Sequence, residues 1–108
     1  MYDILIKNCR IIDGSGAPWY RADVAVKGGK IVKIGHLCGR PGHEAENTVD
    51  GQDRYLAPGF IDIHSHSDTT LMKYPKAESR ILQGVTTEIG GNCGMSASPV
   101  SDDPERKE

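Results

Sequence analysis

Two histidines one residue apart, His64 and His66, are the side chains of this sequence best suited to chemistry. They follow a compact apolar run, GFIDI, and the segment 59–64 predicts a buried strand. Successive side chains of a strand alternate between its faces, so both imidazoles are expected on one face, a few ångströms apart. A single metal ion could then bind both rings.

A cysteine follows the next expected strand. Cys93 lies in GGNCG, directly after the strand predicted over VTTEIGG at residues 85–91, and its glycine neighbours permit a close backbone approach. In parallel α/β folds, ligands gather at the C-terminal ends of the strands, where His64 and His66 also lie. Two imidazole nitrogens and a thiolate form a common zinc ligand set.

Alternatives to a metal site exist for each of these features. A His-x-His pair in a surface loop is usually just solvated, and it is the placement at a strand end that favours metal binding. Asp62 and Asp68 could orient imidazole N–H groups around a metal, although Asp62 could equally be a structural acid bonded to backbone. The glycines around Cys93 could also form an anion-binding nest without a metal.

Residues 58–100 predict a strand, a helix and a second strand. Pro75 suits a first helical turn, Gly84 suits a C-terminal cap, and the apolar residues between them have helical spacing. Roughly twenty residues separate the two strands, which is enough for the crossover that parallel pairing requires. This segment is therefore expected to be a βαβ unit.

Residues 1–57 predict a small β-sheet, so the fold class is mainly β with a βαβ extension. Strand candidates cover residues 2–8, 9–13, 22–27, 30–35, 48–50 and 55–57. The first two are apolar runs broken at Lys7 and Asn8, and together they predict either a bent strand or a hairpin. Gly28 and Gly29 predict a two-residue hairpin of the kind that needs positive φ.

Composition narrows the range of partners. The 108 residues carry 13 Lys and Arg against 15 Asp and Glu, a formal charge of −2, which offers no basic field for nucleic acid or for a membrane surface. The apolar run before Lys7 is too short for a signal peptide or a spanning helix, so a cytoplasmic location is expected. The segment 101–108, with six charged residues and no apolar anchor, is expected to be a disordered tail.

The remaining cysteines and histidines are expected to be structural or solvated. Three cysteines at wide spacing do not resemble a disulfide framework. Cys9 and Cys38 lie in the sheet half, where a lone cysteine is most often a small buried hydrophobe. His36 and His43 lie in a polar loop and are expected to be exposed.

The sequence resembles the N-acyl-D-amino-acid deacylase, or D-aminoacylase, family of the amidohydrolase superfamily. The resemblance is carried by residues 2–35, by APGFIDIHSHSD at 57–68 and by PKAESRILQGVTTEIGGNCG at 75–94. Many amidohydrolases share the first histidine motif, whereas GVTTE followed by GNCG marks this branch. The resemblance implies a composite β-sandwich, with residues 1–57 as its N-terminal part, and a zinc-dependent (β/α)8 barrel beginning with residues 58–100.

The site residues of the family carry over at three positions. His64 and His66 match its metal-binding pair, and Cys93 matches its zinc-ligating cysteine, where other superfamily members use a carboxylated lysine. The later histidines, the aspartate general base and the groups that hold the substrate carboxylate would all lie beyond Glu108. The resemblance thus implies a zinc enzyme that hydrolyses small N-acyl-D-amino acids, no catalytic residue within this chain, and a missing remainder of the barrel.

A different class of protein also fits the length of the chain. It could be a stand-alone, non-catalytic β-domain whose metal ligands are vestigial. An open reading frame continuing past Glu108 with further histidines would favour the enzyme, and a stop codon there would favour the β-domain.

Overall fold

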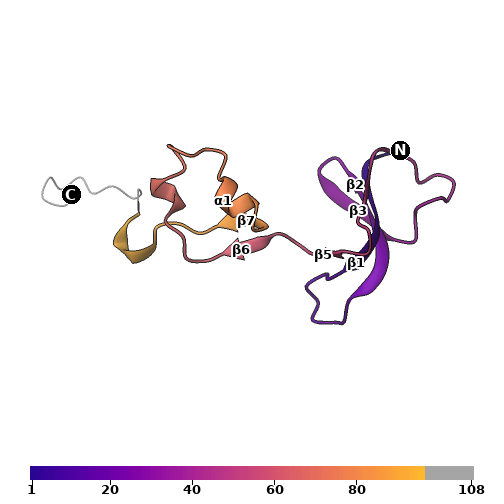
Figure 1. Ribbon diagram of the computed structural model, residues 1–108, viewed down its shortest axis with the longest axis horizontal. Coiled ribbons are helices and arrows are strands. Elements are labelled where there is room, and N and C mark those ends of the chain that lie inside the picture. Colours follow the sequence, from indigo (N-terminus) through magenta and orange to yellow (C-terminus); the bar gives the residue numbers. More distant parts are fainter. Residues whose placement is uncertain (97–108) are drawn as a thin grey trace, which may run out of the picture. The chain divides into compact units, whose positions relative to one another are not determined.

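A computed structural model describes residues 1–96 and divides the chain into two compact units, Met1–Pro58 and a second that begins at Gly59 (Figure 1). The tail expected at 101–108 lies outside the described residues. None of the helices in the described part of the chain has the length and apolar character needed to cross a membrane.

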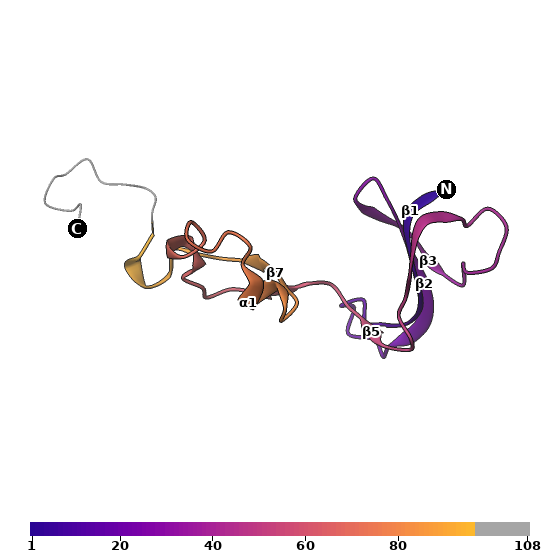
Figure 2. The ribbon, with the colours of Figure 1, turned by 45° about the horizontal axis from the view of Figure 1, so that its top comes forward.

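The first unit is a five-stranded sheet. Its strands are β1 (Tyr2–Ile11), β2 (Tyr20–Lys27), β3 (Lys30–Gly35), β4 (Ala45–Asp50) and β5 (Tyr55–Leu56). The order is β3-β2-β1-β4, and β5 pairs with the second half of β1. Figures 1 and 2 label β1, β2, β3 and β5 of this sheet. The β1–β2 and β2–β3 pairs are antiparallel, whereas β4 and β5 both run parallel to β1.

Two local features of this sheet follow from its residues. β1 is one strand with an irregularity between Ile6 and Cys9, where Asn8 adopts a φ of 58°, so the bent strand is confirmed and the hairpin alternative is wrong. The hairpin at Gly28 and Gly29 is confirmed, with φ values of 58° and 72°. These two residues join β2 to β3 at a turn that requires the left-handed region.

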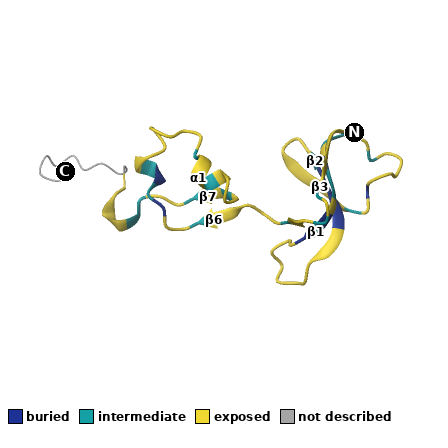
Figure 3. Ribbon diagram, viewed as in Figure 1, coloured by how far each residue is buried: buried dark blue, intermediate teal, exposed yellow. Residues whose placement is uncertain are grey.

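The buried residues of the first unit lie mainly on β1 and β2, and residues 22–25 of β2 are buried in succession, so both faces of that strand are covered (Figure 3). One buried cluster contains Cys9, Ile11, Ala22 and Val24, and a second contains Leu5, Ala25 and Leu37. The burial of Cys9 is as predicted. The same prediction was wrong for Cys38, which is exposed in the loop after β3. His36 is exposed as expected, but His43 is half-buried and stacks on the Tyr2 ring.

Asp23 is a buried carboxylate on β2 that binds three backbone N–H groups. Its Oδ1 accepts from Asn8 at 2.9 Å, and its Oδ2 accepts from Leu37 at 2.8 Å and from Cys38 at 2.9 Å. Burial raises the pKa of Asp23, but the three backbone donors outweigh that effect and leave the pKa below its ordinary value. The carboxylate therefore fixes both the bend in β1 and the loop after β3.

The stability of the first unit should depend on pH through Asp23. Because its pKa is lowered by folding, its contribution is complete above the unfolded pKa of about 4 and is lost as the pH falls through the lower folded value. Asp23→Asn should lower the free energy of unfolding at neutral pH by about 1–3 kcal/mol and weaken the acid dependence. Fluorescence of Trp19, the only tryptophan, reports the unfolding of this unit.

The control for that experiment is Glu46→Gln, which alters an exposed carboxylate of the same unit. It should leave both neutral stability and acid dependence close to those of the unsubstituted chain. An Asp23→Asn variant as acid-sensitive as the unsubstituted chain would show that another group governs the response.

The second unit contains the predicted strand, helix and strand in shortened form. Its elements are β6 (Phe60–Asp62), the 3-10 turn η1 (Ser67–Thr69), α1 (Glu78–Ile81), β7 (Val85–Glu88) and the 3-10 turn η2 (Asn92–Gly94). β6 and β7 pair in parallel, which confirms the βαβ prediction. The helix begins only after Ala77, whose φ of 47° is left-handed and cannot continue a right-handed helix toward Pro75.

Burial in the second unit differs from what the sequence predicts. Phe60 and Ile61 are 62% and 63% exposed, so the prediction of a buried strand is wrong for these residues. Two short strands and a four-residue helix supply too little surface to cover them. Among residues 59–96 the buried side chains are those of two serines, Ser65 and Ser67.

Candidate metal centre

The structure brings His64, His66 and Cys93 together. One ligand atom from each lies within 4.8 Å of the others, although Cys93 follows His64 by 29 residues. Cys93 Sγ and His64 Nε2 are 3.4 Å apart, and the two imidazole centroids are 5.7 Å apart. Sulfur and nitrogen donors of a tetrahedral zinc ion are separated by about 3.5 Å, as follows from its bond lengths. The spacing of the pair therefore suits one metal ion.

The two histidines lie in the loop after β6 rather than on the strand. The strand ends at Asp62, whose Oδ1 accepts a hydrogen bond of 3.1 Å from the backbone N–H of His64. A side chain that bonds the backbone two residues ahead stabilises a turn and competes with strand pairing. The prediction that both rings project from one face of a strand is thus wrong, while their proximity is observed.

Cys93 occupies a strained position in η2. Its φ of 58° and ψ of 25° are left-handed, between Gly91 and Gly94, which have positive φ as well. A left-handed conformation costs a non-glycine residue about 1–2 kcal/mol, so surrounding contacts must hold it. Asn92 provides two of them, since its Nδ2 donates to the carbonyls of Ser65 at 3.1 Å and Ile89 at 2.8 Å.

Asp68 ties the histidine loop to the cysteine loop. Its Oδ2 accepts from the N–H of Gly91 at 2.9 Å, and its Oδ1 accepts from the N–H of Thr69 at 3.1 Å. The hydrogen bonds that the structure gives Asp62 and Asp68 thus go to backbone groups. For Asp62 this agrees with the alternative prediction of a structural acid bonded to backbone. A larger residue than Gly90 would crowd this link, because a Cβ there would lie 3.0 Å from Asp68 Oδ2.

The surroundings of His66 fit a metal ligand. The ring is half-buried, and its Nδ1 is buried without a hydrogen-bond partner in the part of the chain that the structure describes. A buried ring nitrogen normally has a partner. With the thiol of Cys93 and the second imidazole of His64 close by, the donors present fit a zinc ion.

Cys9 and Cys38 take no part in this cluster. Cys9 is buried in β1, where desolvation and then the nearby carboxylates of Asp23 and Asp50 raise the pKa of its thiol. A raised pKa disfavours the thiolate that binds metals. Of the three cysteines, Cys93 is the one that the structure groups with two histidines as possible metal ligands.

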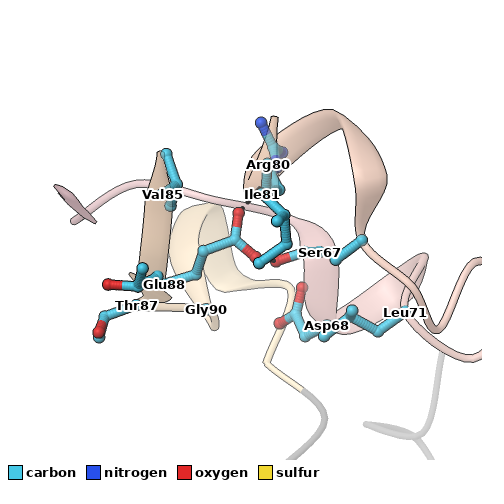
Figure 4. Close-up of a pocket in the computed structure, with 11 residues that line it drawn as sticks. Ser67, Asp68, Leu71, Arg80, Ile81, Val85, Thr87, Glu88 and Gly90 are labelled. Carbon is cyan, nitrogen blue, oxygen red and sulfur yellow. Dashed lines mark hydrogen bonds and ion pairs between the residues drawn. The ribbon is translucent and has the colours of Figure 1, made fainter. Parts of the chain in front are cut away.

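Sequence reasoning missed a polar network next to the histidines. Figure 4 shows the Glu88 carboxylate between Arg80 and Ser67. Glu88 accepts from Ser67 Oγ, from Ser65 Oγ at 3.3 Å and from Arg80 Nε at 2.7 Å. The available signal was the alternation HSHS at residues 64–67, in which serines sit on either side of His66.

Gly90→Ala should loosen the link between the two loops. The added Cβ would displace the Asp68 carboxylate and break its bond to Gly91. Losing one such bond costs about 1 kcal/mol, so the Gly91 amide should exchange about fivefold faster with solvent deuterium. The Ile89 amide, which donates to Asp62 O at 2.9 Å, is the internal control. Unchanged exchange at Gly91 would contradict the prediction.

The chain is similar to a known protein family over most of its length. The sequence profile described as Amidohydrolase family matches residues 47–106. The chain is 41% identical over 99 residues to N-acyl-D-aspartate deacylase of Alcaligenes xylosoxydans xylosoxydans, covering 92% of this chain and 19% of that protein. It is also 41% identical over 100 residues to a D-aminoacylase from the same organism, covering 93% and 20%.

A solved structure has a similar fold. The N-acyl-D-glutamate deacylase of Bordetella bronchiseptica, complexed with zinc and a phosphonate inhibitor, superposes with a TM-score of 0.84 at 42% identity. The match covers 92% of this chain and 20% of that one. The chain thus belongs to the amidohydrolase family, and it spans about a fifth of the length of the relatives it matches. Its strand-rich fold is similar to the corresponding part of the deacylase.

Proposed function

We propose that this chain is the N-terminal part of a zinc-dependent hydrolase that cleaves the amide bond of N-acyl-D-amino acids. The observation that carries the proposal is the convergence of His64, His66 and Cys93 beyond the ends of two parallel strands. The relatives support the proposal as well, because this chain is similar to an N-acyl-D-aspartate deacylase and an N-acyl-D-glutamate deacylase. A small N-acyl-D-amino acid is therefore the proposed substrate.

The architecture of the whole protein is part of this proposal. Residues 1–57 would form the N-terminal share of a β-sandwich, and residues 58–100 the first strand, helix and second strand of a (β/α)8 barrel. The division of the chain at Pro58 and Gly59 and the parallel pairing of β6 with β7 support this assignment. Active sites of such barrels lie at the C-terminal ends of their strands, which is where the three ligands occur.

Each of the three side chains has a defined task in this proposal. His64 and His66 supply neutral nitrogen donors, and Cys93 supplies a negatively charged sulfur that binds zinc strongly. Asn92 and Asp68 hold the two loops at a separation that suits these donors. Zinc held there would polarise the acyl carbonyl and activate water for attack.

The first test concerns the thiolate. Cys93→Ser should sharply lower the zinc retained by the chain after equilibrium dialysis, because a neutral hydroxyl replaces a soft, charged donor of similar size. Cys38→Ser, which alters another exposed cysteine, is the matched control and should retain zinc. Equal zinc content in the two variants would contradict the assignment of Cys93.

The second test concerns activity. The 108-residue chain should release no free D-amino acid from N-acetyl-D-amino acids even with zinc supplied. In this proposal, the general base and the groups that hold the substrate carboxylate come from the rest of the protein, and together they contribute several powers of ten. The reference is the double variant His64→Ala, His66→Ala. Turnover well above that reference would show that the chain is catalytic by itself.

A further inference from the structure

We propose that Glu88 and Arg80 are positioning residues that set the geometry of the metal centre through the two serines beside His66. This inference rests on the proposed metal site and adds residues that bind neither metal nor substrate. It identifies helix α1, from which Arg80 projects, as a support of that site.

Glu88 and the two serines beside His66 form one hydrogen-bond network. Glu88 accepts from Ser67 Oγ with one carboxylate oxygen, while the other lies 3.3 Å from Ser65 Oγ and 2.7 Å from Arg80 Nε. The two serine hydroxyls are themselves 2.6 Å apart, and Ser65 Oγ accepts from the N–H of Ser67 at 3.0 Å. His66 lies between these serines in the chain, so fixing both neighbours fixes its backbone.

The two serines of this network are buried. Ser65 and Ser67 are 2% and 6% exposed, and they are the buried side chains among the described residues of the second unit. Apolar packing therefore does little to hold the histidine loop. A satisfied buried hydrogen-bond network can specify one conformation, because any displacement leaves polar groups without partners.

Glu88 and Arg80 form an ion pair that is partly withdrawn from water. The Glu88 side chain is only 15% exposed, and a carboxylate withdrawn from water requires a counter-charge or several donors. Arg80 provides the counter-charge and is itself 37% exposed. Removing either partner would leave the other poorly compensated next to the two serines.

The same segment also reaches the cysteine loop. Glu88 is the last residue of β7, and the carbonyl of the next residue, Ile89, accepts from the N–H of Ser65 at 3.3 Å. That carbonyl also accepts from Asn92 Nδ2, next to Cys93. Glu88 thus lies at the junction of the two loops, where it can set the distance between the imidazoles and the thiolate.

The experiment is a Co²⁺ titration of the full 108-residue chain, followed by absorption of the thiolate–cobalt charge-transfer band and the d–d bands. Glu88→Gln keeps the size of the side chain but removes its charge and one acceptor. It should weaken Co²⁺ binding by about tenfold or more, the range typical of residues that orient metal ligands. It should also change the spectrum at saturating Co²⁺, where a loss of stability alone would leave the bound spectrum unchanged.

The matched control is Glu78→Gln, which makes the same substitution in α1 at a side chain that is 72% exposed and pairs only loosely with Lys76. It should bind like the unsubstituted chain. Arg80→Gln leaves Glu88 and both serines in place and should also weaken Co²⁺ binding. This second variant still tests the positioning role if the Glu88 variant fails to fold.

The outcomes separate the two proposals. Co²⁺ affinity of Glu88→Gln and Arg80→Gln within twofold of the control, with the same bound spectrum, would overturn the positioning role and leave the metal site standing. If the unsubstituted chain binds no Co²⁺, or binds as well after His64→Ala and Cys93→Ser, the metal site itself is wrong and the positioning role falls with it.

Discussion

The burial of two serine hydroxyls against one carboxylate is the constraint on which the candidate metal centre depends. In most domains, apolar packing holds a loop in place, but here the apolar side chains of β6 are largely exposed. Hydrogen bonds to Glu88 take over that task for the histidine loop. Such bonds are directional, so they fix orientation as well as proximity, which is what a set of metal ligands needs.

The fold was predictable where local residue chemistry determines backbone geometry. Gly28 and Gly29 specify the hairpin, and the connection between the second unit's strands is long enough for the crossover of a parallel pair. The boundaries of the short elements were not predictable. The helix is delayed by the left-handed conformation of Ala77, which an alanine rarely adopts. The strand ends where the side chain of Asp62 bonds the backbone, one of several conformations open to an aspartate.

The members of the candidate site were predictable, but their support was not. His64, His66 and Cys93 stand out by residue type and by their place after predicted strands, and the structure brings them together. Ser65 is marked only by its place in the HSHS alternation, and the type of Glu88 indicates nothing, because serine and glutamate are common surface residues. Only a three-dimensional arrangement shows that they are withdrawn from water and bonded to each other.

The parallel pairing of β1 with β4 and β5 has a consequence for synthesis on the ribosome. The β1–β2–β3 hairpins can form within microseconds of emerging, whereas the other edge of β1 waits for β4 and then β5. These strands end at Asp50 and Leu56, which are 23 and 29 residues beyond the end of β2 at Lys27. At translation rates of about 5–20 residues per second, the part of this edge that pairs with β4 stays open for roughly 1–5 s and the part that pairs with β5 for roughly 1.5–6 s. During that interval the nascent chain presents an open strand edge, a typical template for intermolecular pairing and a natural ligand for chaperones.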